Sequence, residues 1–119
     1  MANSVIEEKT LDFAVRIVRF YKYLCDEKKE FVLSKQILRS GTSIGANVRE
    51  SHFAESTADF IHKKSIALKE ANETAYWLEV MEKSEIVNQE QIAKLKSDLN
   101  EIIAILVSAI KTLKGGKKK

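Results

Sequence analysis

The chain has 119 residues, which suits one domain with a single core, and its 45% hydrophobic and 31% charged residues are typical of a folded protein. One cysteine excludes an internal disulfide framework, and no apolar run approaches the ~20 residues that a membrane-spanning helix needs. The net charge is +3, with the basic excess in residues 1–52 and 85–119, which permits a nucleic-acid partner without requiring one.

The sequence contains no proline and predicts long helices, the first from just after Ser4 to about Asp26. Ser4 and Glu7 have the spacing of a capping box. Acids stand here where a signal peptide would carry basic and apolar residues, so we expect a cytoplasmic protein. Two adjacent apolar stripes run along this helix: Phe13, Ile17, Phe20 and Leu24, and then Ala14, Val18, Tyr21 and Cys25.

A second helix is predicted from about Ser34. It contains two of the four glycines, Gly41 and Gly45, although glycine inside a helix costs roughly 0.5–1 kcal/mol relative to alanine. We therefore expect another helix to approach these positions too closely for a side chain to fit. The apolar side of this helix carries Ile37, Ile44 and Val48.

Ser43, Asn47 and Glu50 belong to the same run of small and polar residues. Asn47 and Glu50 lie one turn apart, behind Gly45. A polar pair at this place either hydrogen-bonds between helices and fixes their register or lines a ligand cleft. We favour the structural interpretation.

Two more helices begin with capping signals, Ser56 with Asp59 and Asn88 with Gln91. The fourth helix is expected to end at Gly115, because glycine tolerates the left-handed conformation common after a helix. The seam of the third helix consists of Phe60, Ala67, Ala71, Leu78 and Met81. The seam of the fourth consists of Ile92, Leu95, Leu99, Ile102, Leu106, Ala109 and Leu113.

Short connections near residues 28–33, 52–55 and 84–87 favour antiparallel neighbours. The sequence therefore predicts an all-α fold, an antiparallel up-down-up-down four-helix bundle over residues 1–114. We expect residues 115–119 to form a mobile basic tail.

The first and fourth helices have more apolar surface than one seam needs. In the fourth helix, Ile103, Val107 and Ile110 lie beside the main stripe. This width favours a homo-oligomer, and a wide core stripe is the alternative. Tyr76 and Trp77 point about 100° apart, so we expect one in the core and the other at a subunit or partner contact.

Catalytic and metal-binding patterns are weak in this chain. Glu55, Asp59 and His62 share one helical face, but a di-iron bundle needs a second such unit, and His52, the other histidine, lies outside it. A solvated face with ion pairs is favoured. Cys25 on an apolar stripe is typical of a structural thiol. We expect a non-enzymatic protein with no metal and no cofactor.

Two clusters of basic residues are candidates for nucleic-acid binding. Exposed cations at such spacings bind phosphates and release counterions, which makes binding dependent on salt. The alternative is a solvated helix surface, because nearby acids dilute the first cluster and a helix C-terminus favours cations in any case. The first cluster comprises Arg16, Arg19 and Lys22, and the second comprises Lys111, Lys114 and Lys117 with the two final lysines.

The run Ile37–Ser51, together with Phe60, Ala67–Ala71 and the aromatic-rich segment Glu73–Glu79, resembles the four-helix bundle proteins of the 23S ribosomal RNA intervening-sequence family, also called S23 ribosomal proteins. The resemblance covers roughly residues 10–113. It departs from the family pattern at two places. Phe31-Val32 stands where the family often has proline, and Ser51 stands where it has glycine.

The resemblance implies an antiparallel four-helix bundle that assembles into a ring-like homopentamer, and it brings no catalytic residue. Many relatives are encoded within segments that interrupt bacterial 23S rRNA genes, and others resemble accessory proteins of diversity-generating retroelements. We therefore expect a non-enzymatic, oligomeric, RNA-binding protein. The alternative is a protein-interaction scaffold, for example for a reverse transcriptase.

Overall fold

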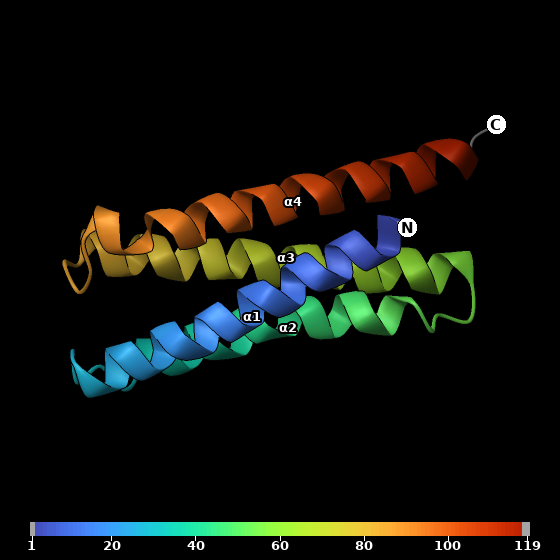
Figure 1. Ribbon diagram of the computed structural model, residues 1–119. Helices are drawn as coiled ribbons and strands as arrows, with labels where there is room; N and C mark the ends of the chain where they lie inside the picture. Colours follow the sequence, from blue (N-terminus) through green and yellow to red (C-terminus); the bar gives the residue numbers. More distant parts are fainter. Residues whose placement is uncertain (1, 118–119) are drawn as a thin grey trace.

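The chain folds into four antiparallel helices that form an all-α bundle (Figure 1). The computed structural model describes the backbone of residues 2–117 and the side chains of residues 5–115. This part of the chain contains no strand, and it is elongated, with extents of 51 × 22 × 22 Å. The helices are α1 (Ala2–Asp26), α2 (Leu33–Ser51), α3 (Thr57–Lys83) and α4 (Gln89–Lys117). The predicted fold class is confirmed.

Two of the predicted capping signals are confirmed at α3 and α4. The Ser56 hydroxyl accepts a hydrogen bond from the Asp59 backbone N–H at 3.0 Å. At α4 the pairing is reciprocal: Asn88 Oδ1 accepts from the Gln91 N–H, and Gln91 Oε1 accepts from the Asn88 N–H, both at 2.8 Å. These bonds satisfy backbone donors that a helix N-terminus leaves without partners.

The start of α2 is capped by a residue to which the sequence analysis gave no role. The carboxylate of Glu30 accepts hydrogen bonds from the backbone N–H groups of Val32, Leu33 and Ser34 at 3.3, 3.1 and 2.7 Å. Lys29 just before it has φ of 53°, which turns the chain sharply between α1 and α2. The negative charge of Glu30 also lies at the positive end of the helix dipole.

Two helix ends differ from the sequence-based expectation. The first helix begins at Ala2 instead of after Ser4, whose side chain lies outside the described residues. The fourth helix continues through Gly115 to Lys117, and no glycine in the described part of the chain has a positive φ. Glycine permits a left-handed helix end without imposing one, so Gly115 remains helical here.

The predicted seams form the core. From α1 the four residues of the first stripe are buried, whereas those of the second stripe remain partly exposed. Three predicted seam residues, Phe60, Ala109 and Leu113, are only partly buried, and they lie where the C-terminal half of α4 passes the start of α3. The outer residues of α4 divide in the same way, because Ile110 is buried and Ile103 and Val107 are partly exposed.

The two glycines of α2 lie against α1, as predicted. A Cβ atom at Gly41 would come within 2.9 Å of the Ile17 side chain, and one at Gly45 would lie 3.2 Å from the backbone oxygen of Thr10. Ile17 and Thr10 are fully buried, so neither has free space into which to move. The cost of glycine in α2 is therefore offset by a close approach of the two helices.

We predict that Gly45→Leu lowers the free energy of unfolding by about 1–3 kcal/mol, because the new side chain meets the backbone of α1. Thermal unfolding followed by circular dichroism measures this effect. Gly115→Ala is the matched control, since nothing lies within 4 Å of a Cβ at that position. Wild-type stability for Gly45→Leu would show that α1 moves away at little cost.

Candidate functional site

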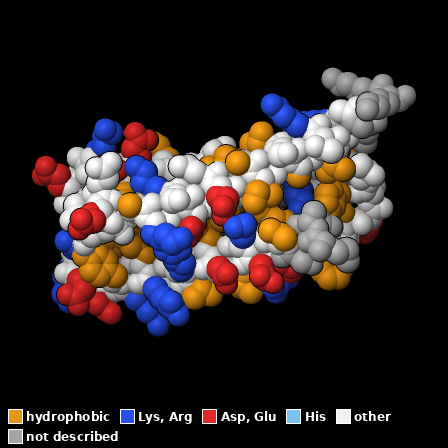
Figure 2. All heavy atoms as spheres, turned by 45° about the horizontal axis from the view of Figure 1, so that its top comes forward, with side chains coloured by type: hydrophobic (Ala, Val, Ile, Leu, Met, Phe, Trp, Pro, Cys, Tyr) orange, Lys and Arg blue, Asp and Glu red, His pale blue; other side chains and the backbone are white. Residues whose placement is uncertain are grey.

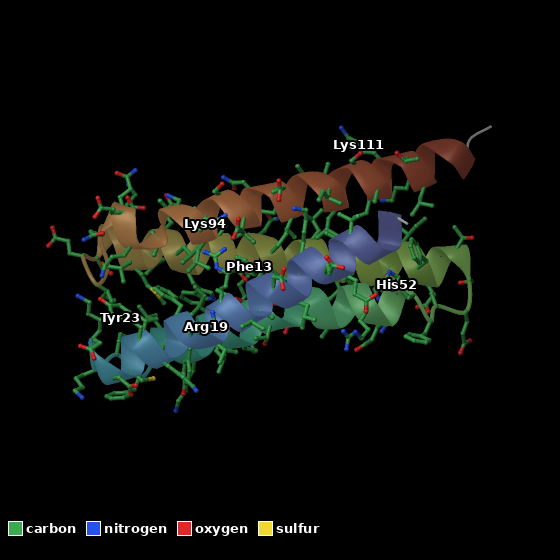
Figure 3. The ribbon with its side chains drawn as sticks, in the orientation of Figure 1. Phe13, Arg19, Tyr23, His52, Lys94 and Lys111 are labelled. Carbon is green, nitrogen blue, oxygen red and sulfur yellow. The ribbon has the colours of Figure 1, made fainter. Side chains whose placement is uncertain are left out.

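The basic residues of α1 do not all remain available for a ligand. Arg16 forms an ion pair with Asp98 of α4, and Lys94 lies 3.2 Å from the same carboxylate. These residues line a groove of about 470 Å³ between α1 and α4. Arg19 lines the same groove and is exposed (Figure 3). Lys22, one turn further on, is also exposed, and neither residue forms an ion pair with residues 5–115. Arg16 therefore stabilises the bundle, and Arg19 and Lys22 are the accessible pair.

The second basic cluster lies near the other end of the bundle. Lys111 and Lys114 are exposed on the last turns of α4, and the side chain of Lys117 is outside the described residues. Figure 3 shows Arg19 and Lys111 far apart along the molecule. Lys94, beside Arg19, is separated from Lys111 by about 25 Å of helix at 1.5 Å per residue. One chain therefore does not join the two clusters into a single surface.

Positive and negative side chains alternate over the face that carries α1 and α4. Figure 2 shows Lys and Arg side chains interspersed with Asp and Glu, and apolar side chains reaching the surface among them. Lys9 contributes to this mixture through an ion pair with Glu101. The face thus has local positive spots without a continuous basic stripe.

The polar residues of the α2 motif make structural contacts. Asn47 donates to the backbone oxygen of Ser43 at 2.9 Å, and Ser43 donates to that of Arg39 at 2.6 Å, all within α2. Glu50 instead reaches α3, where its carboxylate lies 3.0 Å from the Lys63 ammonium. Of the predicted polar pair, only Glu50 links two helices, and Asn47 does not bond to it.

The residues considered for a metal site have separate roles. Asp59 takes part in the N-terminal cap of α3, where its carboxylate accepts from the Glu55 backbone N–H at 3.3 Å, and His62 is exposed. Within the described residues, no group of three or more His, Cys, Asp or Glu side chains is arranged to hold a metal ion. Cys25 is partly buried, with its sulfur 3.8 Å from the Ser34 hydroxyl oxygen.

The adjacent aromatic residues of α3 differ in their exposure. Trp77 packs against the core, and its indole N–H donates to Glu73 at 3.1 Å. Tyr76 is 58% exposed and meets Trp77 edge to face, with 5.2 Å between ring centroids. Trp77 therefore serves the bundle, and a partner contact of Tyr76 stays a prediction.

An apolar groove that the sequence analysis missed lies between the start of α1, the start of α3 and the end of α4. Its volume is about 340 Å³, and Lys64 of α3 is the one charged residue among the described residues that line it. Lys64 is only 2% exposed, with its ammonium 5.1 Å from the centroid of the Phe60 ring. Lys64 forms no ion pair with residues 5–115, and Glu7 acts on it only through longer-range attraction. Burial lowers the pKa of the Lys64 ammonium, and the charge of Glu7 partly opposes this shift.

The sequence did contain a signal for this lysine. Lys64 and Thr74 alternate with the apolar residues of α3 at spacings of four and three, so both occupy seam positions of the heptad pattern. A lysine in a seam predicts either a buried charge or a local opening of the core. The structure shows both.

A charged cluster ties the start of α1 to the end of α2 beside the apolar groove. The carboxylate of Glu7 accepts from Arg49 Nε at 2.8 Å and lies 2.9 Å from His52 Nδ1. The hydrogen bond from Arg49 is the main reason why the pKa of Glu7 is lowered. His52 Nε2 is buried and has no hydrogen-bond partner among residues 5–115. The cluster holds the two helices together.

We predict that Lys64→Met raises the free energy of unfolding at neutral pH by about 1–3 kcal/mol, because it keeps the aliphatic stem and removes a charge held out of water. The folded-state pKa lies below the ordinary value of 10.5, so between these two values the unfolded chain binds more protons. The loss of stability that the buried Lys64 charge causes in the wild type is therefore complete below the folded-state pKa. It declines as the pH rises from that pKa toward 10.5.

Urea unfolding of wild type and Lys64→Met at pH 7 and pH 10 measures this effect, and the advantage of methionine is expected to shrink at pH 10. Lys69→Met, at an exposed position of the same helix, is the control and should change stability by less than about 0.5 kcal/mol. A loss of stability in Lys64→Met at pH 7 would contradict the burial of an uncompensated charge.

Comparison with known proteins places the chain in a family. The model of the 23S rRNA-intervening sequence protein family matches residues 2–108. A crystal structure of a protein of unknown function, from the S23 ribosomal protein family of Bacteroides thetaiotaomicron VPI-5482, is 58% identical with a TM-score of 0.91, over 93% of this chain and 99% of that one. No curated protein matches, and no helix in the described residues is long and apolar enough to cross a membrane. The chain belongs to the 23S rRNA-intervening sequence protein family.

Proposed function

We propose that this protein is a non-enzymatic, oligomeric RNA-binding protein. The observation that carries the proposal is the pair Arg19 and Lys22, exposed one turn apart on α1 and without acidic partners among the described residues. A guanidinium and an ammonium at this spacing suit successive phosphates of a nucleic-acid strand. The name of the family links its members to 23S rRNA, which supports RNA as the nucleic acid.

An oligomer is supported by an exposed apolar stripe on α1. Leu11, Val15 and Val18 are 49%, 43% and 37% exposed, and their spacings of four and three place them on one face. Contact with a second copy would remove this surface from water. Lys22 follows one turn beyond Val18, so it would lie at the rim of such a contact.

A ring of several copies would repeat the Arg19 and Lys22 pair around its axis. Each pair alone offers few phosphate contacts, and linking them raises the overall affinity for one RNA by avidity. The resemblance to the intervening-sequence proteins implies a homopentamer, and we propose this assembly here. We also propose that the protein acts in the cytoplasm.

We predict that Arg19→Glu combined with Lys22→Glu weakens binding to a structured fragment of ribosomal RNA and reduces its salt dependence. Loss of two phosphate contacts per bound chain lowers the slope of log K against log salt by about 1.4–1.8. Fluorescence anisotropy across a salt series measures both quantities.

The control for this experiment is Lys69→Glu combined with Lys83→Glu, which changes net charge equally at exposed positions of α3. A matching loss in the control would mean that net charge, and not the α1 pair, governs binding. No binding of wild type at low salt would remove the RNA proposal.

We predict that Leu11→Gln combined with Val15→Gln weakens self-association at least about tenfold, because a second copy can no longer bury two apolar side chains. Light scattering over a concentration series reports the mass, and circular dichroism checks that the helices persist. Phe53→Gln, a polar replacement at an exposed position between α2 and α3, is the control. A wild-type mass equal to that of one chain would contradict the oligomer.

A scaffold for a protein partner is the second candidate, favoured by a different surface. Tyr76 is exposed beside a shallow hollow of about 470 Å³ that Val80 and Lys83 also line. An exposed aromatic ring next to an aliphatic side chain is typical of protein-interaction surfaces. A well-folded oligomer that binds no RNA would favour this candidate, for example as an accessory factor of a reverse transcriptase.

A further inference from the structure

The groove around Lys64 has the features of a small-molecule site. Its volume of about 340 Å³ lies at the lower end of the range for ligand pockets, roughly 300–1,000 Å³. Three helices supply its walls, and most of its lining side chains are apolar. The groove is lined by Ile6, Phe60, Lys64, Ile105, Leu106, Ala109, Thr112 and Leu113.

Lys64 is the feature that selects the ligand. A lysine is almost never so fully buried without an anion paired to it, because its ammonium loses most of its hydration. The ammonium has the Phe60 ring on one side, and Glu7 attracts it without forming an ion pair. Among the described residues, the groove therefore offers one positive charge beside mostly apolar walls.

We infer that the groove binds a carboxylate carried on an unbranched aliphatic chain. The carboxylate would pair with the Lys64 ammonium and replace the hydrogen bonds to water that burial removes. The aliphatic chain of the ligand would lie along Ile105 and Ala109 of α4. A nucleic-acid phosphate fits this place poorly, because the apolar walls would strip water from a strand whose other phosphates need it. The inference is independent of RNA binding by α1.

Isothermal titration of the full-length protein with sodium decanoate, below the concentration at which it forms micelles, tests this inference. One decanoate per chain is the expected stoichiometry. Lys64→Met should lower decanoate affinity at least about tenfold, because a charged hydrogen bond is lost. The same variant should bind 1-decanol as well as the wild type does, since decanol carries no charge for Lys64 to pair with.

Ala109→Phe is the second variant, because it fills the groove from α4 without touching the charge. It should lower the affinity for decanoate and for decanol alike. Circular dichroism and light scattering measure whether each variant keeps the fold and the mass of the wild type. An equal decanoate affinity in wild type and either variant would overturn the inference.

Absence of decanoate binding to the wild type would also overturn it. If, in that case, Ala109→Phe reduces the mass seen by light scattering, a second copy of the chain occupies the groove. An RNA affinity that stays unchanged in Lys64→Met and Ala109→Phe would show that the groove and the α1 surface act separately.

Discussion

The close contact between α1 and α2 is the constraint on which the rest of the bundle depends. Gly41 and Gly45 present bare backbone to α1, so Ile17 and the Thr10 carbonyl occupy space that side chains would otherwise fill. Thr10 is fully buried, and its hydroxyl donates to the backbone oxygen of Ile6 at 2.8 Å. The contact thus leaves no polar group unpaired at this point, and α1 is held against α2 while α4 packs mainly on α3.

Both candidate sites follow from this arrangement. Because α1 is fixed to α2, it packs less extensively on α4. The two grooves open along the boundary between α1 and α4. Near the middle of the molecule, an ion pair between Arg16 of α1 and Asp98 of α4 bridges this boundary. Toward the end of α4 it is lined by apolar side chains around Lys64. The same loose boundary therefore presents a polar surface and an apolar one.

Local signals in the sequence predicted the elements, because caps and heptad spacings act over one or two turns. The Asn88 and Gln91 pair and the α1 seam are examples, and the glycines of α2 predicted a close helix contact. The candidate site was less predictable, because its charges are set by pairing over long distances. Arg16 forms an ion pair with Asp98, which is 82 positions away in the sequence. No local spacing rule predicts that Arg16 is paired with an acid and that Arg19 is not.

The two polar residues in the α3 seam separate structural from functional explanations. The Thr74 hydroxyl lies 2.9 Å from the Ser40 hydroxyl oxygen and 2.8 Å from the Glu70 backbone oxygen, so its burial is satisfied within the bundle. Lys64 also occupies a seam position and is buried, yet it forms no ion pair with residues 5–115. A satisfied polar residue needs only the fold to explain it. A buried lysine that forms no ion pair with residues 5–115 is explained by an anion that binds beside it, and an apolar tail on that anion would fit the apolar walls of the groove.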